Sequence, residues 1–244
     1  MITASMSTHE IANELRKDYS TVMDRTEYFV KSFGSAAKKT RLYPMHRFYE
    51  YTTPERKNKF IVTLVAKKRS QWKAPLVGIG AYWESPYGVA MAIFEHFPDV
   101  AGVVAIYTTH CISRFRERAE IAKDVSSLDL IKQLTISSPN MEMVHVSPQI
   151  CHNIDNLEDE ETFRYAAVCK AGVFFADVQH DKTEIIFKTF LPFSMLAEEQ
   201  LEALQPQIDI TMSKGLPSPE SVINSRQCVR DIERLLIEDC QGTK

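Results

Sequence analysis

The chain has 244 residues, of which 44% are hydrophobic and 25% are charged, and its formal net charge is −3. These ordinary globular values exclude wholesale disorder, and the length is sufficient for a substantial core. No apolar run approaches the roughly 20 residues that a membrane helix needs, and the first residues lack the pattern of a secretory signal. The sequence therefore predicts a cytoplasmic protein without a membrane partner, organised as a single domain over residues 1–244.

An amphipathic helix is predicted over residues 7–34. Ser7 and Glu10 have the spacing of a capping box, and Gly34 is a candidate for the helix end. Apolar side chains recur on one face, as expected for a helix that packs against a core: Ile11, Leu15, Tyr19, Val22, Phe29 and Phe33.

Residues 36–75 form a basic segment with eleven Lys and Arg side chains against two acidic residues. The segment thus carries +9, and the rest of the chain must carry −12 to give the total of −3. Aromatic residues lie between the charges. Basic groups neutralise phosphates and aromatic rings stack on unpaired bases, so this composition suits single-stranded RNA. The predicted nucleic-acid-binding residues are Lys67, Lys68, Arg69 and Lys73.

The same basic segment has a second interpretation as a solvated loop and strand end, because lysines at sheet edges also block aggregation. Pro44 and Pro54 predict a loop that continues to the strand "KFIVTLVAK". A hairpin or a meander around "ESPYG" is expected next, followed by the strand "VAGVVAIYTT".

The second half of the chain alternates predicted helices and strands. Two helices are expected within "THCISRFRERA" and "SSLDLIKQLTISSPN", and two or three strands within "FRYAAVCKAGVFFADVQHDKTEIIFKTFLP". C-terminal helices are predicted over 194–240, with Ser194 as an N-cap. This order of elements favours an α+β fold with a largely antiparallel sheet and flanking N- and C-terminal helices.

The helix that follows the strand "VAGVVAIYTT" carries the main candidate site. His110, Arg114 and Arg118 share one helix face, and Ile112, Phe115 and Ala119 are expected to pack inward. The imidazole could move a proton, and the guanidinium groups could hold phosphate oxygens near a helix N-terminus that favours anions. The alternative is a solvated stripe whose arginines meet the acidic loop around 158–161.

The stretches "HCISRFRER" at 110–118 and "GVFFADVQHDKTEIIFKTFLP" at 172–192 resemble the ribonuclease toxin group with the barnase, EndoU, colicin and RelE-like fold. The resemblance covers a toxin-like core of about 103–192. It implies metal-independent RNA cleavage, in which the ribose 2′-OH attacks the adjacent phosphate to give a cyclic phosphate. It also implies His110 as acid or base, Arg114 and Arg118 as phosphate ligands, and further donors at Lys188 and Thr189.

The chain departs from that group in three respects. It is 244 residues long, it is net acidic, and some 50 residues separate the two matching stretches. Two interpretations therefore stay open within that group: an active ribonuclease, or a degenerate relative that has lost the catalytic activity. The alternative function is a non-catalytic nucleic-acid or protein-binding module, and a structural domain without a site is the third hypothesis.

No cofactor or metal is predicted. His145, Cys151 and His152 lie close in sequence, but their spacing does not match established zinc sites. The five cysteines are odd in number and widely spaced, which favours reduced thiols over a disulfide framework.

Overall fold

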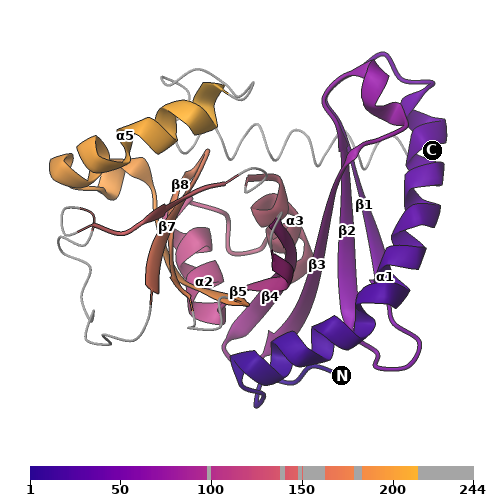
Figure 1. Cartoon of the computed structure of the whole chain (residues 1–244), viewed down its shortest axis with the longest axis horizontal. Helices are drawn as coiled ribbons and strands as arrows, with labels where there is room; N and C mark the ends of the chain where they lie inside the picture. Colours follow the sequence, from indigo (N-terminus) through magenta and orange to yellow (C-terminus); the bar gives the residue numbers. More distant parts are fainter. Residues whose placement is uncertain (98–99, 138–140, 148–149, 151–162, 179–182, 214–244) are drawn as a thin grey trace.

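The computed structural model describes residues 1–97, 100–137, 141–147, 150, 163–178 and 183–213 (Figure 1). Within these residues, nine strands form one sheet in the order β1-β2-β3-β4-β5-β9-β8-β7-β6. The chain has the expected α+β fold with a mostly antiparallel sheet. The strands are β1 (Met45–Thr52), β2 (Lys59–Ala66), β3 (Leu76–Ser85), β4 (Gly88–Phe97), β5 (Val100–Tyr107), β6 (Glu142–His145), β7 (Phe163–Cys169), β8 (Gly172–Val178) and β9 (Glu184–Leu191).

The described helices flank this sheet on both sides. They are α1 (Thr8–Ala37), α2 (Thr109–Arg118), α3 (Ser127–Ser137) and α5 (Glu198–Ser213), with 3-10 turns η1 (Arg69–Trp72) and η2 (Phe193–Met195). None of these helices is long and apolar enough to cross a membrane.

Two antiparallel meanders, β1 to β5 and β6 to β9, meet at one parallel pair of strands. β5 pairs with β9 from Val104 opposite Glu184 to Tyr107 opposite Phe187. A parallel pair needs a crossover connection, and the chain between these strands contains α2, α3 and strands β6 to β8. The two meanders thereby become one continuous sheet.

Both faces of the sheet are packed against helices. On β4, Met91 belongs to the core beneath α2 and α3, whereas its neighbours Ala90 and Ala92 belong to the core beneath α1. On β8, Phe174 lies in the first of these cores and Phe175 in a third core with α5. Successive strand residues point to opposite faces, so α1 and α5 cover one face and α2 and α3 the other. Figure 1 shows α2 and α3 between the two halves of the curved sheet.

Helix α1 confirms the predicted capping box. The Ser7 hydroxyl accepts a hydrogen bond from the Glu10 backbone N–H, and Glu10 accepts one from the Ser7 N–H at 2.7 Å. The predicted end at Gly34 is wrong, because the helix continues to Ala37. A Cβ at Gly34 would lie only 2.9 Å from the carbonyl oxygen of Trp72, so the glycine permits η1 to approach the helix.

The predicted loop before "KFIVTLVAK" is also wrong, because Met45–Thr52 forms strand β1 along the edge of the sheet. Pro44 and Pro54 lie just outside this strand, where a missing N–H removes no ladder hydrogen bond. Strand β6 was not predicted from the sequence.

The chain after β9 differs from the prediction as well. Ser194 lies in η2 and does not cap the next helix, which begins at Glu198. The side chain of Gln200 instead accepts a hydrogen bond from the Ala197 N–H at 2.9 Å. Residues 214–244, which include the last predicted helix, lie outside the described residues.

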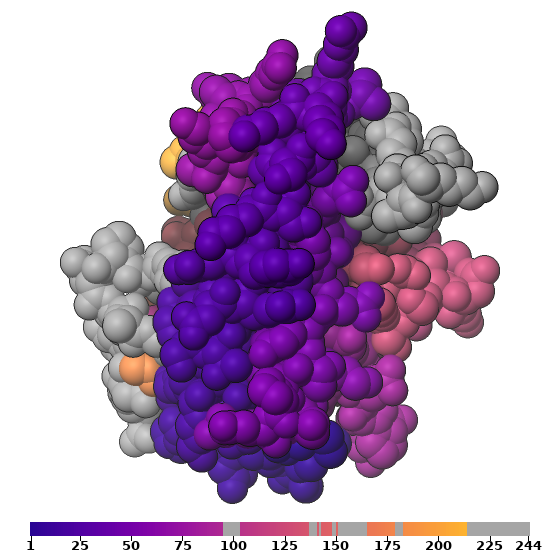
Figure 2. Space-filling model, turned by 90° about the vertical axis from the view of Figure 1, so that its right-hand side faces the viewer, coloured from indigo at the N-terminus to yellow at the C-terminus, as the bar shows by residue number. Residues whose placement is uncertain are grey.

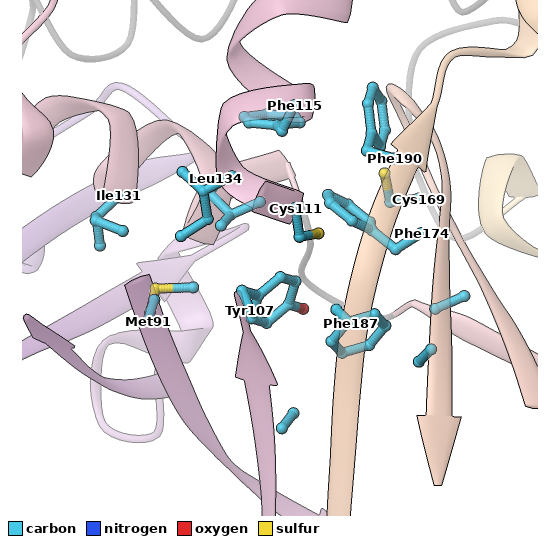
Figure 3. Close-up of a cluster of buried hydrophobic side chains, with 14 of the residues drawn as sticks. Met91, Tyr107, Cys111, Phe115, Ile131, Leu134, Cys169, Phe174, Phe187 and Phe190 are labelled. Atoms are coloured by element: carbon cyan, nitrogen blue, oxygen red, sulfur yellow. The ribbon is translucent and has the colours of Figure 1, made fainter. Parts of the chain in front are cut away.

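A β-bulge in β9 aligns its aromatic side chains. Phe175 lies opposite Thr189 and Ala176 opposite Phe187, so Lys188 has no residue opposite it. The extra residue changes the alternation, and Phe187 and Phe190 both contact Phe174, with ring centroids at 5.9 and 4.8 Å. Figure 3 shows these rings converging with Tyr107 and Phe115 beneath α2.

The turn between β7 and β8 gives a prediction about stability. Gly172 has φ +152°, and a Cβ there would overlap the backbone of Leu191 and Pro192. Gly172→Ala should therefore lower the free energy of unfolding by more than the roughly 1–3 kcal/mol of a strained φ alone. Gly88→Ala is the matched control, because Gly88 also has a positive φ of +126° but nothing within 4 Å of the added Cβ. Urea denaturation measures both, and equal losses would contradict the steric argument.

Candidate functional site

Helix α2 begins where β5 separates from β9. The Thr108 hydroxyl accepts a hydrogen bond from the Cys111 N–H at 3.1 Å, which caps the helix, and it lies 3.1 Å from the Phe187 carbonyl oxygen, to which it donates. Ile112, Phe115 and Ala119 are buried, which confirms the predicted inward face of the helix.

Two of the candidate residues on α2 lie at the surface. His110 is exposed in the first turn. Arg114 donates to Glu117 at 2.8 Å along the same helix, and both side chains are partly exposed. The guanidinium group of Arg114 thus has a local partner one turn away. The acidic loop around 158–161 lies outside the described residues.

Arg118 crosses from α2 to β9. It donates to the Phe190 carbonyl oxygen at 2.6 Å and reaches the Thr189 hydroxyl at 3.4 Å. Burial, and next the positive charge of Arg114, lower the pKa of the Arg118 guanidinium below its usual range. Beyond Phe187, β9 has no pairing with β5, so Arg118 and Thr108 supply hydrogen bonds that a neighbouring strand would otherwise provide.

Lys188 points to the other side of the sheet. Its ammonium group lies 3.3 Å from a carboxylate oxygen of Asp177. Asp177 alternates along β8 with Ala176 and Val178, which are both buried on the α2 side. Lys188 and Asp177 therefore lie on the face opposite α2. The structure brings Thr189 to Arg118, but it does not bring Lys188 to His110 or Arg114.

The cysteines and histidines offer little chemistry in the described part of the chain. Cys111 and Cys169 are buried and form no disulfide. Burial raises the pKa of the Cys111 thiol well above its usual range, which keeps it protonated and unreactive. His145 packs edge-on against Tyr165, and Cys151 and His152 lie outside the described residues. The described residues contain no group of three or more side chains that could hold a metal ion.

The predicted nucleic-acid-binding residues gather at one end of the molecule. They lie in or beside η1, which packs on the end of α1, and Figure 2 shows these two segments side by side at the top. The end of α1 and the following turn add three more exposed cations. We call these seven side chains the basic end: Lys38, Lys39, Arg41, Lys67, Lys68, Arg69 and Lys73.

The basic end has no acidic counterpart nearby in sequence, nor among its contacts with the described residues. Residues 28–49 and 56–83 contain neither Asp nor Glu. Within the described part of the chain, none of the seven cations forms an ion pair with a carboxylate. All seven belong to the basic segment of residues 36–75, but only four of them were predicted to bind nucleic acid. The fold adds Lys38, Lys39 and Arg41 to these four, because the end of α1 meets η1 in three dimensions.

Trp72 joins the two halves of the basic end. The Lys38 ammonium lies 3.7 Å from the centroid of the indole ring, and the Lys73 ammonium lies 5.2 Å from it. The backbone of Trp72 packs on Gly34. The ring therefore fixes Lys38 in place through a cation–π contact.

The other aromatic residues of the basic segment belong to the core. Tyr49 stacks on Phe29 with centroids 4.6 Å apart, and the Tyr43 hydroxyl donates to the Ala37 carbonyl oxygen. The remaining rings of the segment are likewise packed into the hydrophobic clusters: Phe48, Tyr51 and Phe60. Phe60 is fully buried and the other four rings are partly buried, so none of these rings is fully exposed among the cations.

Sequence reasoning missed the buried ionic groups, of which Glu184 is one. Glu184 is fully buried, its Oε1 lies 2.7 Å from His9 Nδ1 and 3.8 Å from Arg16, and its Oε2 has no hydrogen-bond partner among the described residues. This group joins α1 to the first residue of β9. No local pattern could have found it, since 175 positions separate His9 from Glu184.

No protein-family model, curated protein or solved structure matches this chain.

Arg114 and Arg118 of α2 should differ in their contribution to stability. Arg118→Met removes the donor to the Phe190 carbonyl and should cost about 1–3 kcal/mol of unfolding free energy, because a partly buried acceptor loses its partner. Arg114→Met removes only an exposed pair along the helix and should cost less than about 1 kcal/mol. Urea denaturation measures both variants, and a larger loss for Arg114→Met would contradict this assignment.

Proposed function

We propose that this chain binds nucleic acid through the basic end. The single observation that carries the proposal is that α1 meets η1. This brings seven exposed cations to one end of the molecule, two of them over the Trp72 ring, without a carboxylate partner in the described part of the chain. The chain as a whole is acidic, with a net charge of −3. The positive charge is therefore local, as expected for a surface that meets an anionic partner.

The physical basis is the release of counterions. Phosphates condense cations around a nucleic acid, and lysine and arginine side chains release those cations when they replace them. Affinity then falls steeply as salt increases, with a slope that reflects the number of phosphates contacted. This mechanism needs exposed cations and no catalytic group.

RNA cleavage remains the prediction that the toxin-like resemblance implies. The geometry of α2 does not strengthen it, because Arg114 and Arg118 have partners within the protein and Lys188 lies across the sheet. We therefore propose that the chain binds nucleic acid, and RNA cleavage is tested by a separate experiment.

Neutralising the basic end should weaken binding. The variant Lys67→Gln, Lys68→Gln, Arg69→Gln, Lys73→Gln should lose about tenfold or more in affinity for a short nucleic acid, and its salt slope should fall by about one for each lost phosphate contact. Fluorescence anisotropy over about 50–200 mM salt gives both quantities. The matched control changes four exposed lysines outside the basic end to glutamine, and so alters the net charge equally: Lys17, Lys57, Lys59 and Lys123. Equal losses in both variants would contradict a localised site.

His110→Ala should leave binding unchanged, because His110 lies on α2 and not at the basic end. Wild-type protein and this variant should be incubated with mixed-sequence single-stranded RNA in the presence of EDTA. The binding proposal predicts intact RNA in both reactions. Products with cyclic-phosphate ends from wild type alone would instead establish a metal-independent ribonuclease with His110 in its site.

A further inference from the structure

We infer that the basic end recognises the phosphate backbone of duplex nucleic acid and does not read unpaired bases. This inference rests on the proposed function and narrows the class of ligand from nucleic acid in general to the duplex. It also revises the expectation of a single-stranded ligand that the sequence composition suggested.

A surface that binds single strands usually offers exposed rings on which bases stack. The described part of the basic end offers none. Trp72 is only partly exposed, with Lys38 over its ring and the Gly34 backbone against its edge. A base that stacked on the face of Trp72 beneath Lys38 would have to displace the Lys38 ammonium.

The exposed rings of the described residues lie elsewhere. Tyr87 is 86% exposed, but it lies in the turn after β3, at the far end of a ten-residue strand whose first residue is near η1. Tyr28 is 58% exposed, more than two helical turns before the end of α1, and its ring already carries the Arg25 guanidinium at 4.7 Å. Neither ring can therefore stack on a base that is bound at the basic end.

The backbone that carries the cations, in contrast, is held in place by the fold. The backbone N–H groups of Lys67 and Lys68 both donate to the side chain of Gln71, at 2.7 and 3.2 Å. Lys38 lies at the C-terminal end of α1 and Lys73 at that of η1, and both contact the Trp72 ring. A fixed backbone loses little entropy when its cations meet a regular array of phosphates.

Duplex nucleic acid presents such an array. Double-stranded DNA carries about one negative charge per 1.7 Å of its axis, against about one per 3.4 Å for each strand, and its counterion release per contact is also greater. A surface that acts through charge alone should therefore favour the duplex. Sequence should have little effect, because phosphate contacts carry no base information.

The test compares short mixed-sequence duplexes of DNA and of RNA with their component single strands, by fluorescence anisotropy at one salt concentration. The expected result is an affinity for a duplex that is several-fold higher than for either of its strands and that changes little with sequence. The DNA and RNA arms identify which duplex is bound more tightly.

Lys38→Gln separates the two modes of recognition. This exposed substitution removes one cation and uncovers the Trp72 ring. Backbone recognition predicts weaker binding of duplex and single strand alike, whereas base stacking predicts that the single strand is bound as tightly as before or more tightly. Trp72→Leu provides the complementary variant, and a loss confined to the single strand would overturn the inference.

The remaining outcomes distinguish this inference from the proposed function. Tighter binding of single strands than of duplexes would overturn the inference and leave nucleic-acid binding standing. Binding of neither, by a protein whose circular dichroism and unfolding transition are those of the folded chain, would overturn both. Tight binding of vesicles that contain anionic lipid, without binding of nucleic acid, would assign the basic end and the 76% exposed Leu42 beside it to a lipid surface and would likewise overturn both.

Discussion

The parallel pairing of β5 with β9 is the constraint on which the rest of the molecule depends. It joins two antiparallel meanders into one sheet, and it places Tyr107 against Phe187 with stacked rings 4.4 Å apart. The pairing ends after these residues because the chain turns into α2. Thr108 and Arg118 then donate to the carbonyl oxygens of Phe187 and Phe190, so the helix supplies hydrogen bonds where the strand stops. The junction thus explains Arg118, one member of the histidine and arginine pattern of α2.

The elements that were predicted correctly carry strong local signals. The capping box of Ser7 and Glu10, the hairpin around "ESPYG" and the inward face of α2 depend on residues within a few positions of one another. The features that were not predicted depend on distant partners. Gly34 is a packing site for Trp72 and not a helix end, and a bulge at Lys188 shifts the alternation of β9 so that Phe190 joins Phe187 on the α2 side. Neither effect has a local signature.

The predictions about the candidate sites divide in the same way, between local features that were predicted and distant contacts that were not. Spacing correctly placed His110, Arg114 and Arg118 on one helix, but it could not reveal that Arg118 bonds a strand carbonyl. Composition found the positive charge of residues 36–75, but it could not separate the rings that enter the core from the cations that stay exposed. Among the described residues, the fold separates exposed cations from rings that are at least partly buried, and for this reason we propose that the ligand is recognised by its phosphates.

The most direct test of this account is a lysine footprint of the protein with and without a short nucleic-acid duplex. Brief acetylation followed by mass spectrometry reports the reactivity of each lysine separately. The account predicts protection at Lys38, Lys39, Lys67, Lys68 and Lys73, with unchanged reactivity at Lys123 and Lys188. Protection at Lys188 or Lys123, with the basic end as reactive as in the free protein, would contradict it.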